Sequence, residues 1–360
     1  MKKFLFKAFL FFLPFLLVMA LELFVLPIDT FTYRVWEALL VRKMKGILDG
    51  PFYPNMRIHK IEQGDIAPYS AFSVKKEVEW QTDRYGYRKR NTPEERHKIV
   101  IIGDSMLAGI GLTQKELLSE VLEEKLGVSV YPYALRRVST FLKDSRFLRY
   151  PPDLVIFESA EHQIPLLTPL SERQKHVKEE GPLIESFKST REVPCVQSLG
   201  IFLDRLYKEN MLHYFRAQLR RKVSTEKPQY NYRAGNILFL MGAAANKDIP
   251  KKQIDIHAQT IEGYCRTMQK RGIRFIFLPI PNKENIYHNL LPDNKRPVYL
   301  DQLISELKKR GVETVNLQEA FEKEYQTNST LLYWSDDTHW NDKGVQIAAD
   351  LIEQMLKKDE

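Results

Sequence analysis

The spacing of hydrophobic residues changes along the chain, and each change marks a different kind of element. Residues 4–26 are apolar except for Lys7 and Glu22, and about 20 such residues are enough to cross a bilayer as a helix. No long periodic run follows in residues 29–96. The pattern predicts a membrane anchor over residues 1–28, followed by a lead-in segment that packs on the core domain.

A different pattern begins near Lys98. Residues 98–104 (KIVIIGD) form a short run rich in β-branched residues, which is typical of a buried parallel strand. From there, strand-like runs alternate with stretches that place apolar residues at helical intervals. Further strands are expected over 128–134, 153–160, 273–280 and 312–317, and helices over 113–126, 140–148, 259–271, 298–310 and 341–357. This alternation predicts an α/β fold with helices on both faces of a parallel sheet.

Residues 162–255 interrupt the alternation. They contain a helical stretch over 199–222 together with polar, aromatic and glycine-containing segments. We interpret them as an insertion into a core domain that spans residues 97–360. Such an insertion is a candidate lid or acceptor groove.

Composition narrows the function classes. The formal net charge is +8, but part of the excess lies beside the apolar run, where anionic lipid accounts for it. No zinc-finger spacing or aromatic-rich basic platform is present, so no nucleic-acid partner is predicted. The sequence also lacks a P-loop, a dinucleotide fingerprint and a metal-ligand cluster, so no cofactor and no metal are predicted. Cys195 and Cys265, the only cysteines, leave open a single disulfide or two buried free thiols.

The charges around the apolar run predict its orientation in the membrane. Lys2 and Lys3 precede the run, and positive residues tend to remain on the cytoplasmic side, which would export the rest of the chain. Arg42 and Lys43 oppose this bias. Because no A-x-A-like cleavage site follows the run, the sequence favours an uncleaved single-pass anchor over a signal peptide.

Ser105 is the candidate nucleophile. It follows the first strand of the core domain in the tripeptide Gly103-Asp104-Ser105, which places its hydroxyl at the ligand-binding C-terminal edge of the sheet. A serine hydroxyl needs a base to take its proton, and backbone N–H groups of the same turn can hold a developing oxyanion. A serine that merely caps a helix is the alternative interpretation.

A second candidate segment precedes the last expected helix. Asp337 and His339 lie there in the sequence W-S-D-D-T-H-W, close enough for one loop to present both to the sheet edge. The carboxylate would orient the imidazole, and the imidazole would serve as the base for Ser105. The spacing D-x-x-H would select Asp336 instead, and the following Trp340 favours Asp337.

Together these segments resemble the SGNH/GDSL hydrolase superfamily. Its members are serine esterases, lipases and polysaccharide O-acetyltransferases, which implies a three-layer, flavodoxin-like α/β/α sheet. The D-T-H-W of Asp337 to Trp340, the stretch Pro279 to Tyr287 and the ESAEH of Glu158 to His162 resemble the branch related to alginate O-acetyltransferases. In that branch, acetyl groups delivered by a membrane-bound O-acyltransferase pass to extracellular polysaccharide.

The chain departs from the superfamily at the oxyanion hole. Arg137 and Glu161 stand where a glycine and an asparagine are expected. Arg136 or Arg137 could act as a cationic donor, and an ion pair with Glu158 or Glu161 is the alternative that we favour. The serine also precedes the D-T-H-W segment, whereas it follows that segment in alginate acetyltransferases.

The resemblance implies a membrane-anchored serine O-acyltransferase or esterase that moves acetyl groups on a polysaccharide through an acyl-serine. Residues expected to contact substrate are Arg137, Glu161, Lys283, Tyr287 and Trp340. The expected partners are a polysaccharide acceptor, a membrane-bound O-acyltransferase and membrane lipid. A carbohydrate or lipid esterase, a D-alanyl transfer protein and a non-catalytic glycan-binding protein remain alternatives.

Overall fold

The structure is a computed structural model that describes residues 2–45, 47–68, 70–90, 96–171, 193–208, 211, 214–216, 218–219, 232–240 and 249–358. The strands are β1 (Arg57–Glu62), β2 (Lys76–Gln81), β3 (Ile99–Gly103), β4 (Val130–Ala134), β5 (Leu154–Ala160), β6 (Tyr232–Ala234), β7 (Ile237–Phe239), β8 (Arg274–Ile280) and β9 (Glu313–Thr314). The α-helices are α1 (Lys2–Phe24), α2 (Val35–Leu39), α3 (Leu118–Leu126), α4 (Val138–Phe141), α5 (Ser145–Arg149), α8 (Pro194–Lys208), α10 (Lys251–Gln269), α11 (Lys283–Ile286), α12 (Tyr299–Lys309), α13 (Leu317–Asn328) and α14 (Asp342–Lys357). Short 3₁₀ turns are η1 (Gln114–Glu116), η2 (Glu161–Leu166) and η3 (His288–Leu290).

Five strands form one parallel sheet in the order β4-β3-β5-β8-β9. At the middle of β3, Ile101 pairs with Pro132 of β4 on one side and with Ile156 of β5 on the other. The chain therefore winds away from β3 in both directions, which is the flavodoxin-like order. The predicted α/β class with a flavodoxin-like parallel sheet is confirmed.

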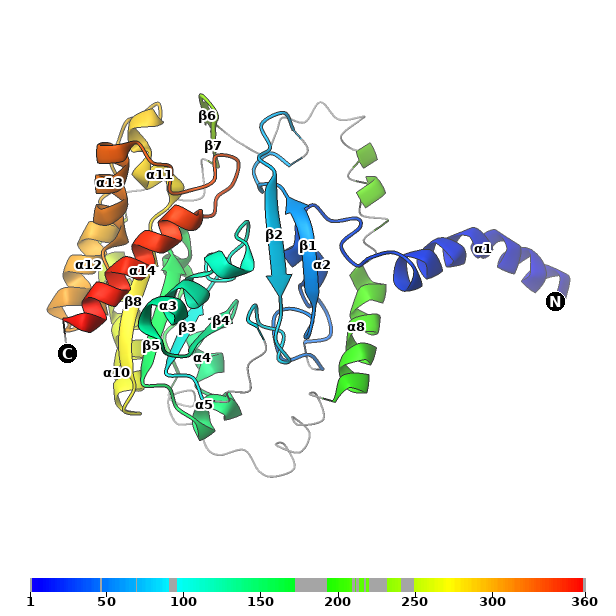
Figure 1. Ribbon diagram of the computed structural model, residues 1–360, viewed down its shortest axis with the longest axis horizontal. Helices are drawn as coiled ribbons and strands as arrows, with labels where there is room; N and C mark the ends of the chain where they lie inside the picture. Colours follow the sequence, from blue (N-terminus) through cyan, green and yellow to red (C-terminus); the bar gives the residue numbers. More distant parts are fainter. Residues whose placement is uncertain are drawn as a thin grey trace.

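Alternate residues of β3 supply two hydrophobic cores, one on each face of the sheet. Ile99 and Ile101 pack with residues of α3, α13 and α14. Val100 and Ile102 pack with residues of α4, α5, α10 and α12. These helices form the two outer layers (Figure 1). Every residue of β3, β4 and β5 is buried, as a parallel sheet covered on both faces requires.

Some expected elements differ from those observed. The helix expected over 140–148 is divided into α4 and α5, because the Asp144 side chain accepts the backbone N–H of Arg146 and starts a new helix. The strand expected over 312–317 is reduced to β9. Leu317, the last residue of the expected strand, instead begins α13, a helix that the sequence analysis did not predict.

The lead-in segment contains its own small sheet. Strands β1 and β2 pair as an antiparallel hairpin, and Val78 and Trp80 on β2 join the same core as Ile101. The Trp80 ring packs edge-on against Phe52, with 5.1 Å between the ring centroids. The hairpin thereby covers part of one face of the central domain (Figure 1).

The predicted insertion at 162–255 divides into parts with different positions. Helix α8 lies against the lead-in segment, where its Asp204 carboxylate accepts the backbone N–H groups of Arg42 and Lys43. It does not cover the sheet edge that carries Ser105, so this part of the insertion does not form a lid over that residue. The hairpin β6-β7 instead contacts the segment before the last helix, since the Leu238 N–H donates to the Ser335 carbonyl. The remainder of the insertion lies largely outside the described residues.

Helix α1 extends away from the domain (Figure 1). It is long and apolar enough to cross a membrane, and none of its residues is buried in the protein. Its Glu22 lies at the domain end, where the carboxylate accepts the backbone N–H of Met211. The acidic residue is thus partnered at the end of the apolar run.

Both cysteines are free thiols. Cys265 is buried on α10, whereas Cys195 is exposed on α8. The alternative of a single disulfide is therefore not adopted, and only one of the two thiols is buried.

We expect Gly103→Ala to destabilise the protein, because a Cβ there would clash with the buried Oε2 of Glu158 on the neighbouring strand. Overpacking of this kind costs about 1–3 kcal/mol. The measurement is the free energy of unfolding in urea. The matched control is Gly263→Ala on α10, where nothing lies within 4 Å of the new Cβ. That change should stabilise by about 0.4–1 kcal/mol. Similar effects of the two substitutions would contradict the packing of the Glu158 side chain against Gly103.

Candidate active site

Ser105 lies just beyond the C-terminal end of β3, which ends at Gly103. The strand order reverses at β3, and the crevice at such a switch point is where open α/β sheets bind ligands. The turn is fixed by Asp104, whose carboxylate accepts the backbone N–H groups of Met106 and Ala160 at 2.9 Å each. Asp104 therefore holds the turn in place.

The structure brings Ser105, His339 and Asp337 together. Ser105 Oγ lies 3.0 Å from His339 Nε2, and His339 Nδ1 lies 2.6 Å from Asp337 Oδ1. The same Asp337 oxygen accepts the backbone N–H of His339 at 3.1 Å. In this arrangement an imidazole can take the hydroxyl proton while a carboxylate orients the ring.

The loop that carries His339 is fastened at both ends. Tyr333 and Trp340 pair as an antiparallel bridge across it. Trp340 is fully buried, and its indole N–H donates to the Met106 carbonyl at 3.2 Å. Because Met106 directly follows Ser105, this bond ties the imidazole loop to the turn that presents the hydroxyl.

The charges around His339 favour its protonated form. Burial lowers the pKa of His339, but the adjacent Asp337 carboxylate outweighs burial and raises that pKa above its ordinary value. Burial likewise raises the pKa of Asp337, but His339, Lys76 and Arg34 outweigh it and hold the pKa well below the usual range. Asp337 is therefore a carboxylate, and His339 has the raised basicity that a proton acceptor needs.

Asp336 has a different role from Asp337. One of its carboxylate oxygens accepts the backbone N–H groups of Gly64 and Val74 at 2.8 Å each. Its other oxygen lies 3.1 Å from Lys76 Nζ, which also lies 3.4 Å from Asp337. Asp336 thus fixes the lead-in segment to this loop, and D-x-H is the spacing that reaches the imidazole.

The lead-in segment supplies groups that the sequence analysis missed. Lys76 is buried between two carboxylates. Asp65 accepts both the backbone N–H and the hydroxyl of Thr338, at 2.9 and 2.7 Å, and lies 3.8 Å from His339 Nδ1. Arg34 lies 3.9 Å from Asp65. No local motif marks these residues, because only the packing of the hairpin brings them to the loop.

The ion pairs expected for Arg136 and Arg137 do not form among the residues that the structure describes. Arg136 turns away and donates to the Asp49 carbonyl and the Tyr87 hydroxyl. Glu158 instead accepts the backbone N–H of Asp104 at 2.9 Å. Burial, followed by the nearby Asp104 charge, raises the pKa of Glu158 well above its ordinary value.

The residue after β4 also differs from expectation. Leu135 has a φ of 56°, a left-handed conformation that glycine adopts without steric cost. The backbone therefore places the position suited to glycine at Leu135, two residues before Arg137. Arg137 has an exposed side chain.

Four of the expected substrate-contacting side chains are used inside the protein. Glu161 accepts the N–H of Asn282 at 3.0 Å, and the Tyr287 hydroxyl accepts the N–H of Leu332 at 2.8 Å. Lys283 donates to four backbone carbonyls, three of them in the loop at residues 334–337, and burial lowers its pKa to about 8. With Trp340, these residues support the loop, and substrate contact by them stays a prediction.

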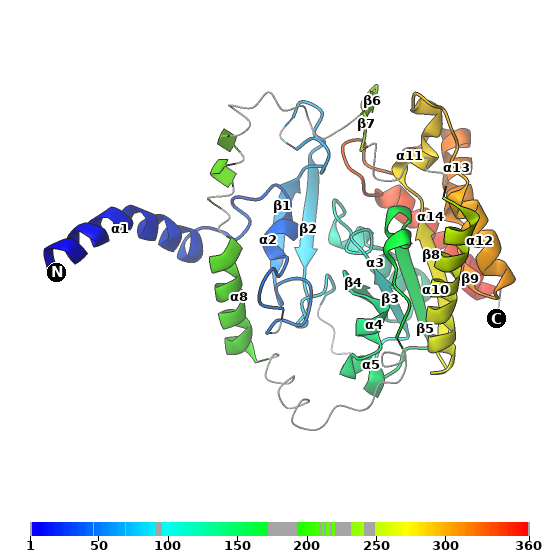
Figure 2. The same ribbon diagram turned by 180° about the vertical axis from the view of Figure 1, so that it is seen from behind.

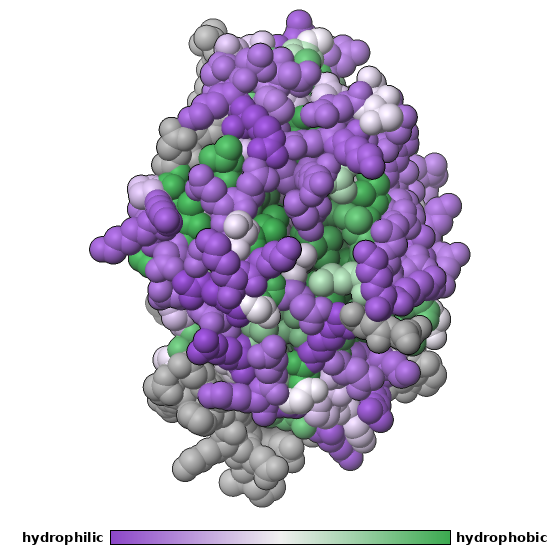
Figure 3. Space-filling view, turned by 90° about the vertical axis from the view of Figure 1, so that its left-hand side faces the viewer, coloured by the Kyte–Doolittle hydropathy of each residue, from purple (hydrophilic) through white to green (hydrophobic). Residues whose placement is uncertain are grey.

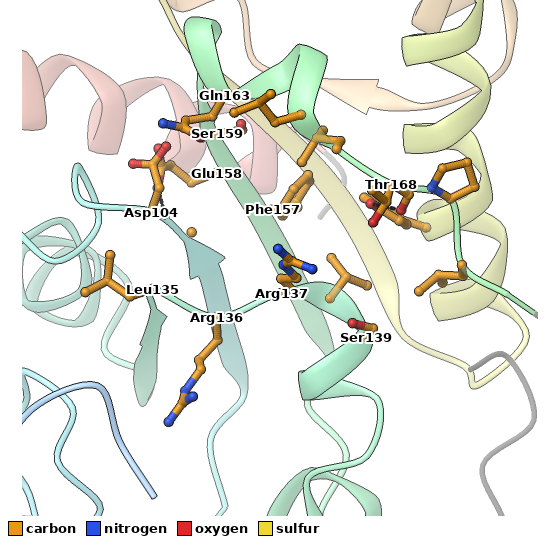
Figure 4. Close-up of a pocket in the computed structure, with 17 residues that line it drawn as sticks. Asp104, Leu135, Arg136, Arg137, Ser139, Phe157, Glu158, Ser159, Gln163 and Thr168 are labelled. Atoms are coloured by element: carbon orange, nitrogen blue, oxygen red, sulfur yellow. Dashed lines mark hydrogen bonds between the residues drawn. The ribbon is translucent and has the colours of Figure 1, made fainter. Parts of the chain in front are cut away.

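Arg137 lines an open pocket of about 310 Å³ beside the Ser105 turn. Segments after β3, β4 and β5 form its wall, and Asp104 and Glu158 lie at one end of it (Figure 4). Arg137 lies between them and Thr168, whereas Arg136 points away (Figure 4). Ser105 is not among the lining residues. The pocket therefore adjoins the candidate nucleophile without containing it.

Three residues around the imidazole could also be considered as ligands for a metal ion. Ligand atoms of Asp65, Asp337 and His339 lie within 4.8 Å of one another. A cation there would have to bind His339 Nδ1, which already shares a proton with Asp337 at 2.6 Å. Metal binding and imidazole orientation are therefore competing uses of these atoms.

Comparison with protein families gives a match for the C-terminal third of the chain. Residues 238–360 match the family model described as SGNH hydrolase-like domain, acetyltransferase AlgX. The match includes Asp337 and His339 and begins after Ser105. A search of curated proteins found no match.

Several solved structures are similar at low identity. A lipase/acylhydrolase from Enterococcus faecalis is 10% identical, covers 73% of this chain and 96% of its own, and has a TM-score of 0.36. The acetyl xylan esterase AlAXEase is 11% identical over 71% of this chain and 98% of its own, with a TM-score of 0.35. A variant of the acetyl-xylooligosaccharide esterase Axe2 from Geobacillus is 12% identical over 72% and 93%, with a TM-score of 0.34. The family model matches residues 238–360, and the fold is established by the observed strand order.

We expect Asp337→Asn to shift the acid limb of the activity profile to lower pH. Activity requires neutral His339, so with a raised pKa it should be lost as the pH falls through a value above the ordinary ~6.5. Without the Asp337 carboxylate, burial lowers the pKa of His339. The imidazole also loses the group that orients it, so kcat should fall by about 10⁴-fold. The measurement is kcat/KM against pH with 4-nitrophenyl acetate.

Asp336→Asn is the matched control, because that carboxylate bonds Gly64 and Val74 and not the imidazole. It should move the acid midpoint far less than Asp337→Asn. Equal midpoints in the wild type and in Asp337→Asn would contradict the assigned orientation of His339.

Proposed function

Starting from a C-terminal region that matches the SGNH hydrolase-like acetyltransferase AlgX model, we propose that the protein is a membrane-anchored serine O-acyltransferase or esterase. It moves acetyl groups on a cell-surface or exported polysaccharide through an acyl-serine intermediate. The single observation that carries this proposal is the geometry of Ser105, His339 and Asp337, with 3.0 Å and 2.6 Å between successive partners.

In the first half-reaction, Ser105 Oγ attacks the acyl carbonyl and its proton passes to His339 Nε2. Asp337 stabilises the resulting imidazolium, which is consistent with its low pKa. The negative charge on the carbonyl oxygen is held by the backbone N–H of Ser105. The imidazolium then returns the proton to the leaving group, and the acyl group remains on Ser105.

In the second half-reaction, an acceptor hydroxyl attacks the acyl-serine. His339 takes the acceptor's proton and returns it to Ser105 Oγ, so the enzyme is regenerated. A sugar hydroxyl gives an acylated glycan, and water gives free acid. Which product forms depends on acceptor positioning and on the exclusion of water.

Location and architecture support a cell-envelope role. Helix α1 is long and apolar enough to anchor the chain, and the orientation predicted from Lys2 and Lys3 puts the domain outside the cytoplasm. The pocket beside Ser105 is lined by apolar side chains with polar ones among them, including Arg137 and Thr168, and these polar groups can bind the hydroxyls of an acceptor. A membrane-bound O-acyltransferase that supplies acetyl groups remains the partner implied by the resemblance.

We expect the detergent-solubilised full chain to react with a fluorophosphonate probe at Ser105, because its hydroxyl lies 3.0 Å from an imidazole that the Asp337 carboxylate orients. Ser105→Ala should abolish labelling, measured by gel fluorescence and peptide mass spectrometry. Ser139→Ala, which alters a serine of the neighbouring pocket, should leave labelling unchanged. Labelling that persists in Ser105→Ala would contradict the proposal.

Product analysis distinguishes transfer from hydrolysis. We expect incubation with 4-nitrophenyl acetate and an oligosaccharide to give an acetylated sugar by mass spectrometry, since an acyl-serine can be intercepted by a hydroxyl. Free acetate alone, at an unchanged rate with and without oligosaccharide, would identify an esterase. Ser105→Ala measures the background of both reactions.

A further inference from the structure

Helix α8 reverses the usual arrangement of an amphipathic helix. Its buried positions are Gln197, Gly200, Asp204 and Lys208, which form one stripe at helical spacing and are mostly polar. A surface helix of a globular domain ordinarily buries its apolar stripe and exposes its polar one. The polar face of α8 is therefore the one attached to the protein.

The buried polar groups are all partnered, so this orientation of α8 is specific. The Asp204 carboxylate accepts the Lys43 N–H at 2.6 Å and the Tyr53 hydroxyl at 2.8 Å. Gln197 donates to the Arg84 carbonyl at 2.9 Å. Turning the helix about its axis would leave these groups buried without partners, which is costly.

The outward face of α8 is apolar. Leu199 is 55% exposed and Tyr207 is 63% exposed, and Phe202, Leu203 and Leu206 between them are only partly covered. Nearby, Phe215 and Leu219 are 57% and 64% exposed. Exposed apolar side chains gathered on one face of a helix mark an interaction site.

The position of α8 indicates what covers that surface. The ring of Phe202 lies 5.9 Å from that of Phe24 at the end of α1, and the Arg205 guanidinium donates to the Glu22 carbonyl at 2.7 Å. Helix α8 runs across the direction of α1 where α1 leaves the domain (Figures 1 and 2). A helix placed in this way beside a membrane-spanning helix lies along the membrane surface.

The basic residues beside α8 and the hydrophilic surface on the other side of the molecule agree with a position of α8 at the membrane surface. Arg42, Lys43 and Lys45 are exposed beside α8, where they can meet lipid phosphates. The opposite face of the molecule, on the side of α12, is mostly hydrophilic (Figure 3). The combination of apolar residues and basic neighbours is typical of helices that lie in a membrane interface.

We propose that α8 is an interfacial helix whose outward face is embedded in the surface of a bilayer containing anionic lipid. This inference rests on the proposed membrane anchoring by α1. Together α1 and α8 fix both the distance and the orientation of the domain at the membrane, whereas α1 alone would fix only the distance. The buried depth expected for such a helix is about 5–10 Å into the headgroup and acyl boundary.

The test is spin labelling of the full chain in nanodiscs of phosphatidylcholine and phosphatidylglycerol. In a Cys195→Ser background, labels are attached to Leu199→Cys and Leu206→Cys, while the buried Cys265 stays unlabelled. The matched control is Val298→Cys, 46% exposed at the start of α12 on the opposite side of the domain. Leu16→Cys reports on α1. Collision rates with oxygen and with a water-soluble nickel chelate are measured for each label.

We expect the oxygen-to-nickel ratio at 199 and 206 to exceed that at 298 severalfold and to approach that at 16. Water-like ratios at 199 and 206 with a lipid-like ratio at 16 would overturn the interfacial helix alone. A water-like ratio at 16 would overturn the anchor as well. Strong dipolar broadening between labels at 199 would show that a second copy of the chain covers the face, and would also overturn the proposal.

Discussion

The candidate active site depends on the buried ammonium group of Lys76, which lies 3.1 Å from Asp336 and 3.4 Å from Asp337. Two adjacent buried carboxylates would repel each other without a cation between them. Lys76 lies on β2 of the lead-in hairpin, so the charge that stabilises this loop comes from outside the central domain. Breaking a buried ion pair costs about 3–5 kcal/mol. The folded imidazole loop is therefore stabilised by the hairpin, and the hairpin by the loop.

The nucleophile side depends on close packing rather than on charge. The Glu158 carboxylate on β5 packs so closely against Gly103 of β3 that it occupies the space a side chain at 103 would need. Glu158 then accepts the backbone N–H of Asp104, and Asp104 accepts that of Ala160 on β5. The turn before Ser105 is thereby attached to the neighbouring strand. A rigid strand end holds the hydroxyl, and a charged loop brings the imidazole to it.

The two ends of the molecule have different surfaces and different tasks. α1 and the outward face of α8 are apolar, whereas the opposite face is mostly hydrophilic (Figure 3). The lead-in segment connects these ends, since it holds α8 through Tyr53 and holds the imidazole loop through Lys76. The proposed attachment of α8 to the membrane and the arrangement of the site therefore depend on the same short segment.

Local pattern in the sequence determined much of this protein. The β-branched run at residues 98–104, the spacing of later helices and the apolar N-terminus predicted the sheet and α1, because side-chain periodicity follows directly from backbone geometry. The pairing of Ser105 with His339 was predicted from motifs. Only the tertiary structure brought Lys76 to the loop, gave Leu135 its left-handed backbone and turned the polar face of α8 inward. These depend on contacts between segments far apart in the chain, which no local pattern records.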